Sequence, residues 1–441
     1  MLHRTPQLVL LLLVANAFGQ EEVLDSPPTW HGGVAAIVKE NCGVCHQAGG
    51  SGPFSLMSYN DVSRRRLFVE HVLEEEIMPP WLPSAGVAVV GDRRLSHAEK
   101  TRLLAWIKAG APEGDPSESA VVKQGRQESV SPMPGPQVQT ASMRSPWTVP
   151  AEGGKRWFAA ERDKRTFVLP LKNASPLRVQ AIQYETTAPL ALGATALAVD
   201  TTGNARRIVD WDEEPGSYMM GDFGFTAAGT LAVLGPGGGR LEIPKGFHIQ
   251  IPANADLVSE VHFRPQGREW ELNDTIRLEE VSPAIESRPL GALNLMVRKL
   301  EVDAGETATL EQSMDIPFAL DLIALSPRAS RRCVWMRLTA EIPGHDEAIV
   351  LLEVQDWDPH YRSTLVLEEP MTLPTGTKIR GVWKYDNSAQ NPRNPVNPPE
   401  DVSLGSRCGV ANVLLLCAPV ESERLTELEQ YAQREVLKAQ R

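Results

Sequence analysis

The chain has 441 residues, of which 42% are hydrophobic and 23% are charged, and 56 acidic against 44 basic residues give it a net charge of −12 at pH 7. This negative balance argues against nucleic acid or an anionic membrane surface as a partner. The sequence also has no G-x-S-x-G motif, no phosphate-binding glycine loop and no metalloprotease helix.

The first 19 residues are predicted to be a signal peptide. Arg4 and the amino terminus precede an apolar run from Leu8 to Val14, which small residues at Ala15 and Ala17 follow. This pattern is typical of an exported protein cleaved near Ala17 or Gly19. The run is too short to span a bilayer, and no later segment is long and apolar enough. We therefore expect a periplasmic or secreted protein without a membrane span.

Residues 39 to 59 read KENCGVCHQAGGSGPFSLMSY and contain a Cys-X-X-Cys-His pattern at Cys42, Cys45 and His46. This pattern is the attachment signature of c-type haem, in which the thiols form thioethers and the imidazole binds the iron. A zinc site fits less well, because no second Cys or His pair follows at zinc-finger spacing. A chance occurrence of the pattern stays open. We predict one covalent haem per chain, held by Cys42 and Cys45, with His46 as an axial ligand.

The second axial ligand is predicted to be Met78, in EEEIMPPWLP, because the two following prolines would hold an extended segment in place. The rival candidates are Met57, which lies close to the attachment side, and His71 and His97, which read as surface positions. Ser96 and Glu99 form a predicted capping box. Short helices are expected near residues 32 to 41, 61 to 77 and 97 to 109.

A composition rich in Ser, Gln and Pro predicts a flexible linker at residues 117 to 146. From 147 onward, short apolar runs such as RTFVLPL, DLVSEVHF and AIVLLEVQDWD alternate with turn residues, which is typical of β-sandwiches. A break near residue 285 divides these runs into domains 147 to 284 and 285 to 420. Residues 421 to 441 read as a solvated terminal helix.

The N-terminal part of the chain resembles a cytochrome domain known from exported bacterial proteins. In those proteins the domain is fused to copper type II, ascorbate-dependent monooxygenase modules. The resemblance rests on three stretches, ENCGVCHQAGGSGPFSLMSYND, IMPPWLP and LLAWIKAGAPEGDP. The resemblance covers residues 31 to 116 and supports Met78 as the distal ligand. Residues 147 to 420 resemble the double-sandwich core of the peptidylglycine and dopamine monooxygenases, through VDTTG, EVHFRPQG and LPTGTKIRGVWKYDNSAQNPRNP. The implied fold is multidomain: a small all-α cytochrome c domain followed by two all-β, jelly-roll-like sandwich domains.

That family uses two copper sites, but the resemblance places Gly193, Ala194, Arg328, Ser330 and Asn412 at five of the six ligand positions. His262 alone matches and is a candidate residual copper ligand. His248 and His262 flank an apparent hairpin turn, PANAD, so we expect them to share a face of one sheet. There they could form a weaker metal site, and the alternative that both are ordinary strand residues stays open. We do not expect the sandwiches to bind copper in the family's manner.

The sequence thus predicts an electron-transfer protein with a covalent haem, whose monooxygenase-like sandwiches serve for docking or ligand binding. Its expected partners are a redox protein and a small molecule or peptide in the sandwich cleft. Two alternatives stay open: an active copper monooxygenase that receives electrons from its own haem, and a haem-containing structural or sensory component without turnover. The sequence leaves open the pairing of Cys333, Cys408 and Cys417.

Overall fold

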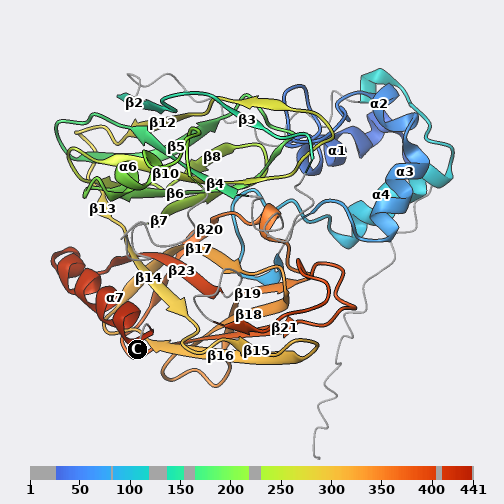
Figure 1. The fold of residues 1–441 in the computed structure, drawn as a ribbon. Helices are drawn as coiled ribbons and strands as arrows, with labels where there is room; N and C mark the ends of the chain where they lie inside the picture. Colours follow the sequence, from blue (N-terminus) through green and yellow to red (C-terminus); the bar gives the residue numbers. More distant parts are fainter. Residues whose placement is uncertain are drawn as a thin grey trace, which may run out of the picture.

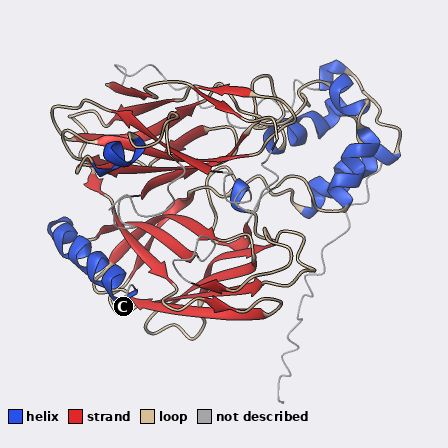
Figure 2. Ribbon diagram, viewed as in Figure 1, coloured by secondary structure: helices blue, strands red, loops and turns tan. Residues whose placement is uncertain are grey.

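The computed structural model describes residues 26–80, 83–118, 137–152, 164–217, 230–403 and 410–439. The predicted signal peptide, Trp81, Cys408 and most of the predicted linker lie outside these residues. Two β-sandwiches stack on one another, and the N-terminal helices gather beside them (Figures 1 and 2). Among the described residues no helix has the length and apolar character needed to cross a membrane.

The helical segment begins with an irregular turn, η1 (Trp30–Val34), and continues through α1 (Ala35–Asn41), α2 (Tyr59–Ser63), α3 (Arg66–Glu74) and α4 (His97–Lys108). The predicted capping box is present, because the Ser96 side chain accepts from the Glu99 N–H and the Glu99 side chain accepts from the Ser96 N–H. Trp30 and Trp106 lie 5.9 Å apart between ring centroids at the centre of a small apolar core. A short turn, η2 (Pro116–Glu118), ends the segment.

The expectation of a small all-α domain before the sandwiches is wrong. The structure is 40% strand and 18% helix, and Pro83–Gly86 form a strand, β1, that pairs with β19 (Ile349–Gln355) of the second sandwich. Val89 is 4% exposed in the core of that same sandwich. The physical reason lies in the sequence after Met78, where prolines end helix formation and leave an extended chain that completes the edge of a sheet.

The first sandwich consists of two main sheets that share one apolar core. One sheet has the order β4 (Lys164–Pro170), β10 (Asp256–Phe263), β6 (Leu192–Asp200) and β7 (Thr230–Leu234). The other has the order β13 (Arg288–Pro289), β9 (Phe247–Ile251), β5 (Leu177–Glu185), β12 (Thr275–Glu280) and β2 (Val138–Ser142), with β8 (Gly239–Glu242) also on β5. A ribbon of β3 (Trp147–Val149) and β11 (Trp270–Leu272) and the short helix α6 (Asn204–Val209) complete this sandwich.

The second sandwich repeats this two-layer plan. One sheet has the order β1, β19, β18 (Cys333–Glu341), β21 (Lys378–Asp386) and β16 (Thr307–Asp315). The other has the order β14 (Gly291–Met296), β23 (Ala411–Pro419), β17 (Leu320–Ala329) and β20 (Leu365–Leu373). A pair of short strands, β15 (Glu301–Val302) and β22 (Val402–Ser403), and a turn, η4 (Pro359–Tyr361), lie outside these sheets.

The two sandwiches are packed together through an apolar interface. Ile323, Val366 and Leu414 belong to strands of the second sandwich but lie in the core cluster of the first. Every residue of β23 is buried, because one face of its sheet covers the second core and the other faces the first sandwich. This double coverage explains the continuous apolar run of ANVLLLCAP.

Three further expectations need correction. Residues 138 to 142, assigned to the linker, form β2 and pair with β12. β9 and β10 lie in different sheets, so PANAD joins two layers and His248 and His262 do not share a face. After the turn η5 (Ser422–Arg424), the terminal helix α7 (Leu425–Ala439) is not fully solvated, because Leu428 and Ala432 are 0% and 3% exposed in the second core.

Asp274, beside β12, is a buried carboxyl group in the first sandwich and predicts an unusual pH dependence. It accepts a hydrogen bond from Tyr184. Burial raises its pKa to about 6, although the hydrogen bonds from Tyr184 and Thr186 act to lower this pKa. The folded chain binds this proton more tightly than the unfolded chain does. Protonated Asp274 therefore stabilises the fold at low pH, and this contribution to the free energy of unfolding is lost as pH rises from about 4 to above 6. The rise from 3.8 to about 6 corresponds to roughly 3 kcal/mol at pH 7.

We therefore expect Asp274→Asn to become more stable relative to wild type as pH rises, by up to about 3 kcal/mol between pH 4 and pH 7.5. Denaturant unfolding at several pH values measures this difference. Asp210→Asn is the control, since Asp210 is an exposed carboxylate paired with Arg144 at 3.0 Å. A difference between Asp274→Asn and wild type that does not change with pH would contradict the prediction.

Candidate functional site

The Cys-X-X-Cys-His loop leaves the end of α1 and folds back tightly on itself. The N–H of Cys42 donates to the Val38 carbonyl at 2.9 Å, and the N–H of His46 donates to the Cys42 carbonyl at 2.9 Å. The N–H of Gly52 then donates to the Cys45 carbonyl at 2.8 Å. Cys42, Cys45 and His46 are thus brought together on one short turn, and both thiols are free.

The imidazole of His46 is held in one orientation. Its Nδ1 lies 2.9 Å from the Phe54 carbonyl oxygen, which requires Nδ1 to carry a proton and leaves the Nε2 lone pair for a metal. His46 is 8% exposed. A Cβ at Gly52 would lie 2.7 Å from His46 Nδ1, so glycine at this position allows the loop to close on the ring. The donor set and its support fit an axial iron ligand.

An exposed apolar surface lies beside this loop. The Phe54 ring lies 4.9 Å from His46 and 6.2 Å from Phe68 of α3, between ring centroids. Phe68 is 54% exposed and Leu67 is 67% exposed. Of the eleven large apolar side chains exposed among the described residues, six lie between residues 44 and 90: Val44, Met57, Leu67, Phe68, Ile77 and Val90. Phe68, whose ring contacts Phe54, thus places exposed apolar surface close to His46.

The candidates for a second iron ligand are placed as follows. Met78 comes four residues after the end of α3, and its N–H donates to the Val72 carbonyl at 3.1 Å. Met57 lies beside the attachment loop, where a Cβ at Gly43 would be 3.1 Å from Met57 Sδ. His71 and His97 are both exposed. The position of Met57 on the attachment side and the surface positions of the two histidines agree with the sequence analysis.

The two thiols of the loop have different surroundings. Burial, and after it the neighbouring Cys45, raises the pKa of Cys42 to about 11. The Arg93 guanidinium lies 3.8 Å from Cys45 Sγ. Cys42 is therefore a weak nucleophile at neutral pH, which is the opposite of what a redox dithiol needs at the first cysteine of its motif.

A cavity of about 630 Å³ lies on the Cys45 side of the loop. We call it the junction cavity, because five separate stretches of the chain contribute to its wall: 44–51, 90–93, 183–189, 233–241 and 363–364. A Cβ at Gly237 would lie 2.6 Å from Ser51 Cβ, which shows how closely the loop and the first sandwich approach.

His262 lies in a different place, between the sandwiches, within a group of charged side chains that we call the Glu260 cluster: Glu260, His262, Lys164, Arg328 and Arg362. The Glu260 carboxylate lies 3.6 Å from Lys164, 3.7 Å from Arg328 and 3.4 Å from Arg362. Although burial alone would raise the pKa of Glu260, the charges of Lys164 and Arg328 outweigh it and hold this pKa well below its usual range.

This arrangement does not fit a copper site. Arg362 Nη2 lies 3.1 Å from His262 Nε2, and a guanidinium can only donate, so it occupies the lone pair that a copper ion would need. Arg328, which the resemblance noted above places at a histidine position, pairs with Glu260 at 3.7 Å. Among the described residues no group of three or more His, Cys, Asp or Glu side chains could hold a metal. His248 lies elsewhere, hydrogen-bonded through Nδ1 to Ser287 at 2.8 Å.

His360 belongs to the same region and was missed by sequence reasoning. Its ring lies 6.3 Å from that of His262, between centroids, and its Nε2 lies 3.1 Å from Arg331 Nη2. A Cβ at Gly193, which the resemblance aligns with a copper ligand, would lie 2.9 Å from the His360 ring. No sequence signal links His360 to β6 or β10, because η4 (Pro359–Tyr361) lies far along the chain from both strands.

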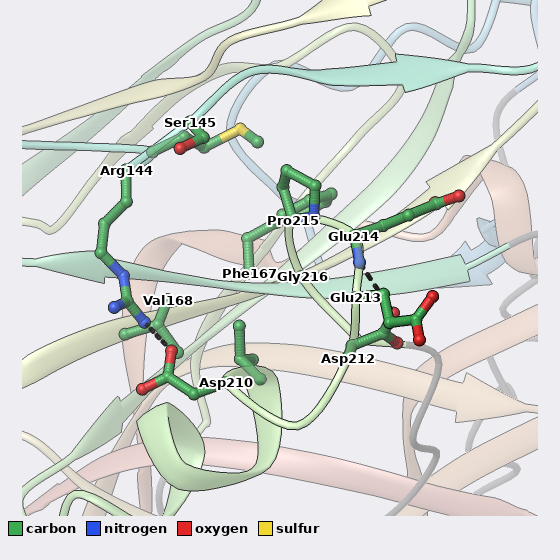
Figure 3. Close-up of a pocket in the computed structure, with 12 residues that line it drawn as sticks. Arg144, Ser145, Phe167, Val168, Asp210, Asp212, Glu213, Glu214, Pro215 and Gly216 are labelled. Carbon is green, nitrogen blue, oxygen red and sulfur yellow. Dashed lines mark hydrogen bonds and ion pairs between the residues drawn. The ribbon is translucent and has the colours of Figure 1, made fainter.

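A second cavity, of about 450 Å³, lies between β4 and the acidic segment 210–216 (Figure 3). Arg144 binds Asp210 at its rim, and the Glu214 N–H donates to Asp212. The buried Arg165 donates to Asp212 at 3.2 Å and to the carbonyl of Pro215 at 2.6 Å. The acidic side chains named here take part in holding this segment onto the sandwich, which is a structural role.

No protein-family model and no curated protein matches the sequence. Among solved structures, the chain is similar to an α-L-fucosidase described as putative from Bacteroides ovatus, at 11% identity over 73% of this chain and 43% of that one, with a TM-score of 0.18. It is also similar to the infectious bursal disease virus VP2 subviral particle, at 8% identity over 64% and 71% of the chains, with a TM-score of 0.18. The major capsid protein P2 of bacteriophage PM2 matches at 8% identity over 58% and 99%, with a TM-score of 0.23.

Proposed function

We propose that this chain is an exported electron-transfer protein that carries one haem covalently at Cys42 and Cys45, with His46 as an axial iron ligand. The observation that carries the proposal is the hydrogen bond from His46 Nδ1 to the Phe54 carbonyl, which presents Nε2 as a ligand one residue after a pair of free thiols. When bound, the haem supplies a one-electron couple. The chain's own residues attach it, orient the imidazole and offer an apolar surface at Leu67 and Phe68.

The sandwiches are proposed to have a non-catalytic role. Their candidate copper ligand, His262, accepts from Arg362, and the Glu260 cluster stabilises the sandwich interface with ion pairs where the monooxygenase-like family uses metal ions. The helical segment is attached to the second sandwich by β1 and contacts the first at Gly237. The sandwiches therefore act as a rigid support for the attachment loop and as a docking or ligand-binding module for a redox partner.

Metal content per chain tests this proposal. The chain is produced with a haem-attachment system, incubated with copper, desalted and analysed for iron and copper in the same sample. We expect one iron and no retained copper per chain, and a haem that a mild reductant can reduce. Absence of iron, or one or two tightly held coppers, would contradict the proposal.

Met78 is proposed as the second axial ligand, and its substitution gives a separate spectroscopic prediction. We expect Met78→Ala to keep the covalent haem but to lose the low-spin spectrum of the oxidised protein, because the iron loses a thioether ligand. Met57→Ala is the matched control and should leave the spectrum unchanged. A low-spin spectrum that persists in Met78→Ala and disappears in Met57→Ala would assign the ligand to Met57 instead.

A further inference from the structure

We propose that the second sandwich binds a small inorganic anion, of the size and charge of chloride, at the side chain of Arg332. This binding site goes beyond the electron-transfer role proposed above. Arg332 belongs to the turn between β17 and β18, and its carbonyl accepts from the N–H of Asp386, the last residue of β21, at 2.9 Å. β18 and β21 are neighbours in one sheet (Figure 1).

Arg332 is a buried positive charge that pairs with no carboxylate of the described residues. Three arginines of this part of the chain are buried, at 1%, 2% and 2% exposed: Arg165, Arg332 and Arg362. Arg165 lies 3.2 Å from Asp212, and Arg362 lies 3.4 Å from Glu260. Arg332 instead donates from Nε to the neutral amide oxygen of Asn387 at 2.7 Å. Because a guanidinium keeps its proton and a buried charge needs a partner, an anion is expected beside it.

The Arg332 guanidinium still has a buried N–H group to donate. Its Nη1 atom has no hydrogen-bond partner among the residues that the structure describes. The bond to Asn387 holds the guanidinium in place, because the Asn387 amide nitrogen donates to the carbonyls of Val302, Asp303 and Glu400 at 3.2, 3.0 and 2.8 Å. Buried N–H groups in folded proteins nearly always have an acceptor. The Nη1 group therefore indicates an acceptor from outside the described chain.

The hydroxyl of Ser330 supplies a second donor for the anion. The Ser330 N–H and the Tyr385 hydroxyl both donate to the Val410 carbonyl, so Ser330 lies close to the Tyr385 phenol. The Oγ atom of Ser330 is buried and has no hydrogen-bond partner among the described residues. Although burial raises the pKa of Tyr385, the charge of Arg332 acts to lower it. The guanidinium and the hydroxyl are thus both near this one phenol.

The neighbouring acidic groups do not replace the anion. Burial raises the pKa of Cys333 to about 12 and also raises the pKa of Tyr385, so both groups are neutral at pH 7. The Asp386 carboxylate accepts from the Ser388 N–H at 2.8 Å and makes no ion pair with Arg332. The ligand is small because Arg332 and Ser330 are only 2% and 9% exposed, and it is monovalent because it balances a single guanidinium charge.

Chlorine NMR of the purified full-length holoprotein tests the proposal, because chloride that exchanges with a binding site broadens the chloride signal. We expect saturable broadening with wild type and at least tenfold weaker chloride binding to Arg332→Gln, which loses the charged donor. Ser330→Ala removes only a hydroxyl and should bind chloride with an affinity between these two. Arg337→Gln is the matched control and should bind like wild type, since the Arg337 side chain of β18 is 45% exposed and lies 3.6 Å from Glu353.

The proposal is overturned if wild type shows no saturable broadening up to about 0.1 M chloride, roughly tenfold above a Kd of about 10 mM. It is also overturned if Arg332→Gln and Ser330→Ala both bind chloride as tightly as wild type. Nitrate should displace chloride, and displacement by an equal concentration of sulfate would contradict a small monovalent ligand. Circular dichroism checks the fold of each variant. If Arg332→Gln does not fold, Ser330→Ala decides alone, and chloride binding as tight as that of wild type would overturn the proposal.

Discussion

Replacement of both Cys42 and Cys45 by serine is expected to abolish covalent haem, so that no haem remains on the polypeptide after denaturing electrophoresis. Each thioether needs one thiol, and the structure brings both free thiols and His46 onto a single turn. Each single serine variant should keep at most one thioether. The absorption of the reduced pyridine complex then shifts, because one vinyl group of the haem remains unsaturated.

The control for these variants is Cys333→Ala. Cys333 is also a free thiol, but it is 1% exposed in the second sandwich, where burial raises its pKa to about 12. We expect this variant to keep a full complement of covalent haem. Haem that stays bound to the Cys42→Ser/Cys45→Ser chain through denaturation would contradict the attachment site.

The turn that brings Cys42, Cys45 and His46 together was predictable because these residues are close in sequence, whereas haem attachment there stays a prediction. Cys42, Cys45 and His46 lie within five positions, and the capping box of Ser96 and Glu99 within four, so local spacing alone determines these contacts. The strands that alternate buried and exposed residues, such as β21, were also readable from their pattern. In each case the information lies within one short segment of chain.

The wrong predictions concern contacts between distant segments. β1 was read as part of a helical domain because Pro83–Gly86 are too few to show a strand period, and their partner β19 lies more than 260 residues away. His248 and His262 were placed on one hairpin because PANAD resembles a tight turn, whereas the chain crosses there from one sheet to the other. The charges around Glu260 come from β4, β10, β17 and the segment before β20. No local pattern could have assembled them.

Glu260→Gln is expected to lower stability by about 3 kcal/mol at pH 7, because it removes the carboxylate shared by Lys164, Arg328 and Arg362 and leaves their charges partly buried between the sandwiches. The side chains of Lys164 and Arg362 are 14% and 3% exposed, so water replaces the lost partner poorly. Urea unfolding at pH 7 measures the loss. Glu311→Gln is the control, since its ion pair with Arg380 is about half exposed and should contribute less than about 1 kcal/mol.

The same variant has a predicted pH dependence that separates charge from packing. The pKa of Glu260 is held well below its usual value of 4.5, so its stabilising effect is present above pH 4.5 and is lost as pH falls below that value. The difference between wild type and Glu260→Gln should therefore be largest at neutral pH and should shrink in acid. If the difference stays constant from pH 7 to pH 3.5, the cost of the substitution comes from altered packing, and the ion pairs do not hold the two sandwiches together.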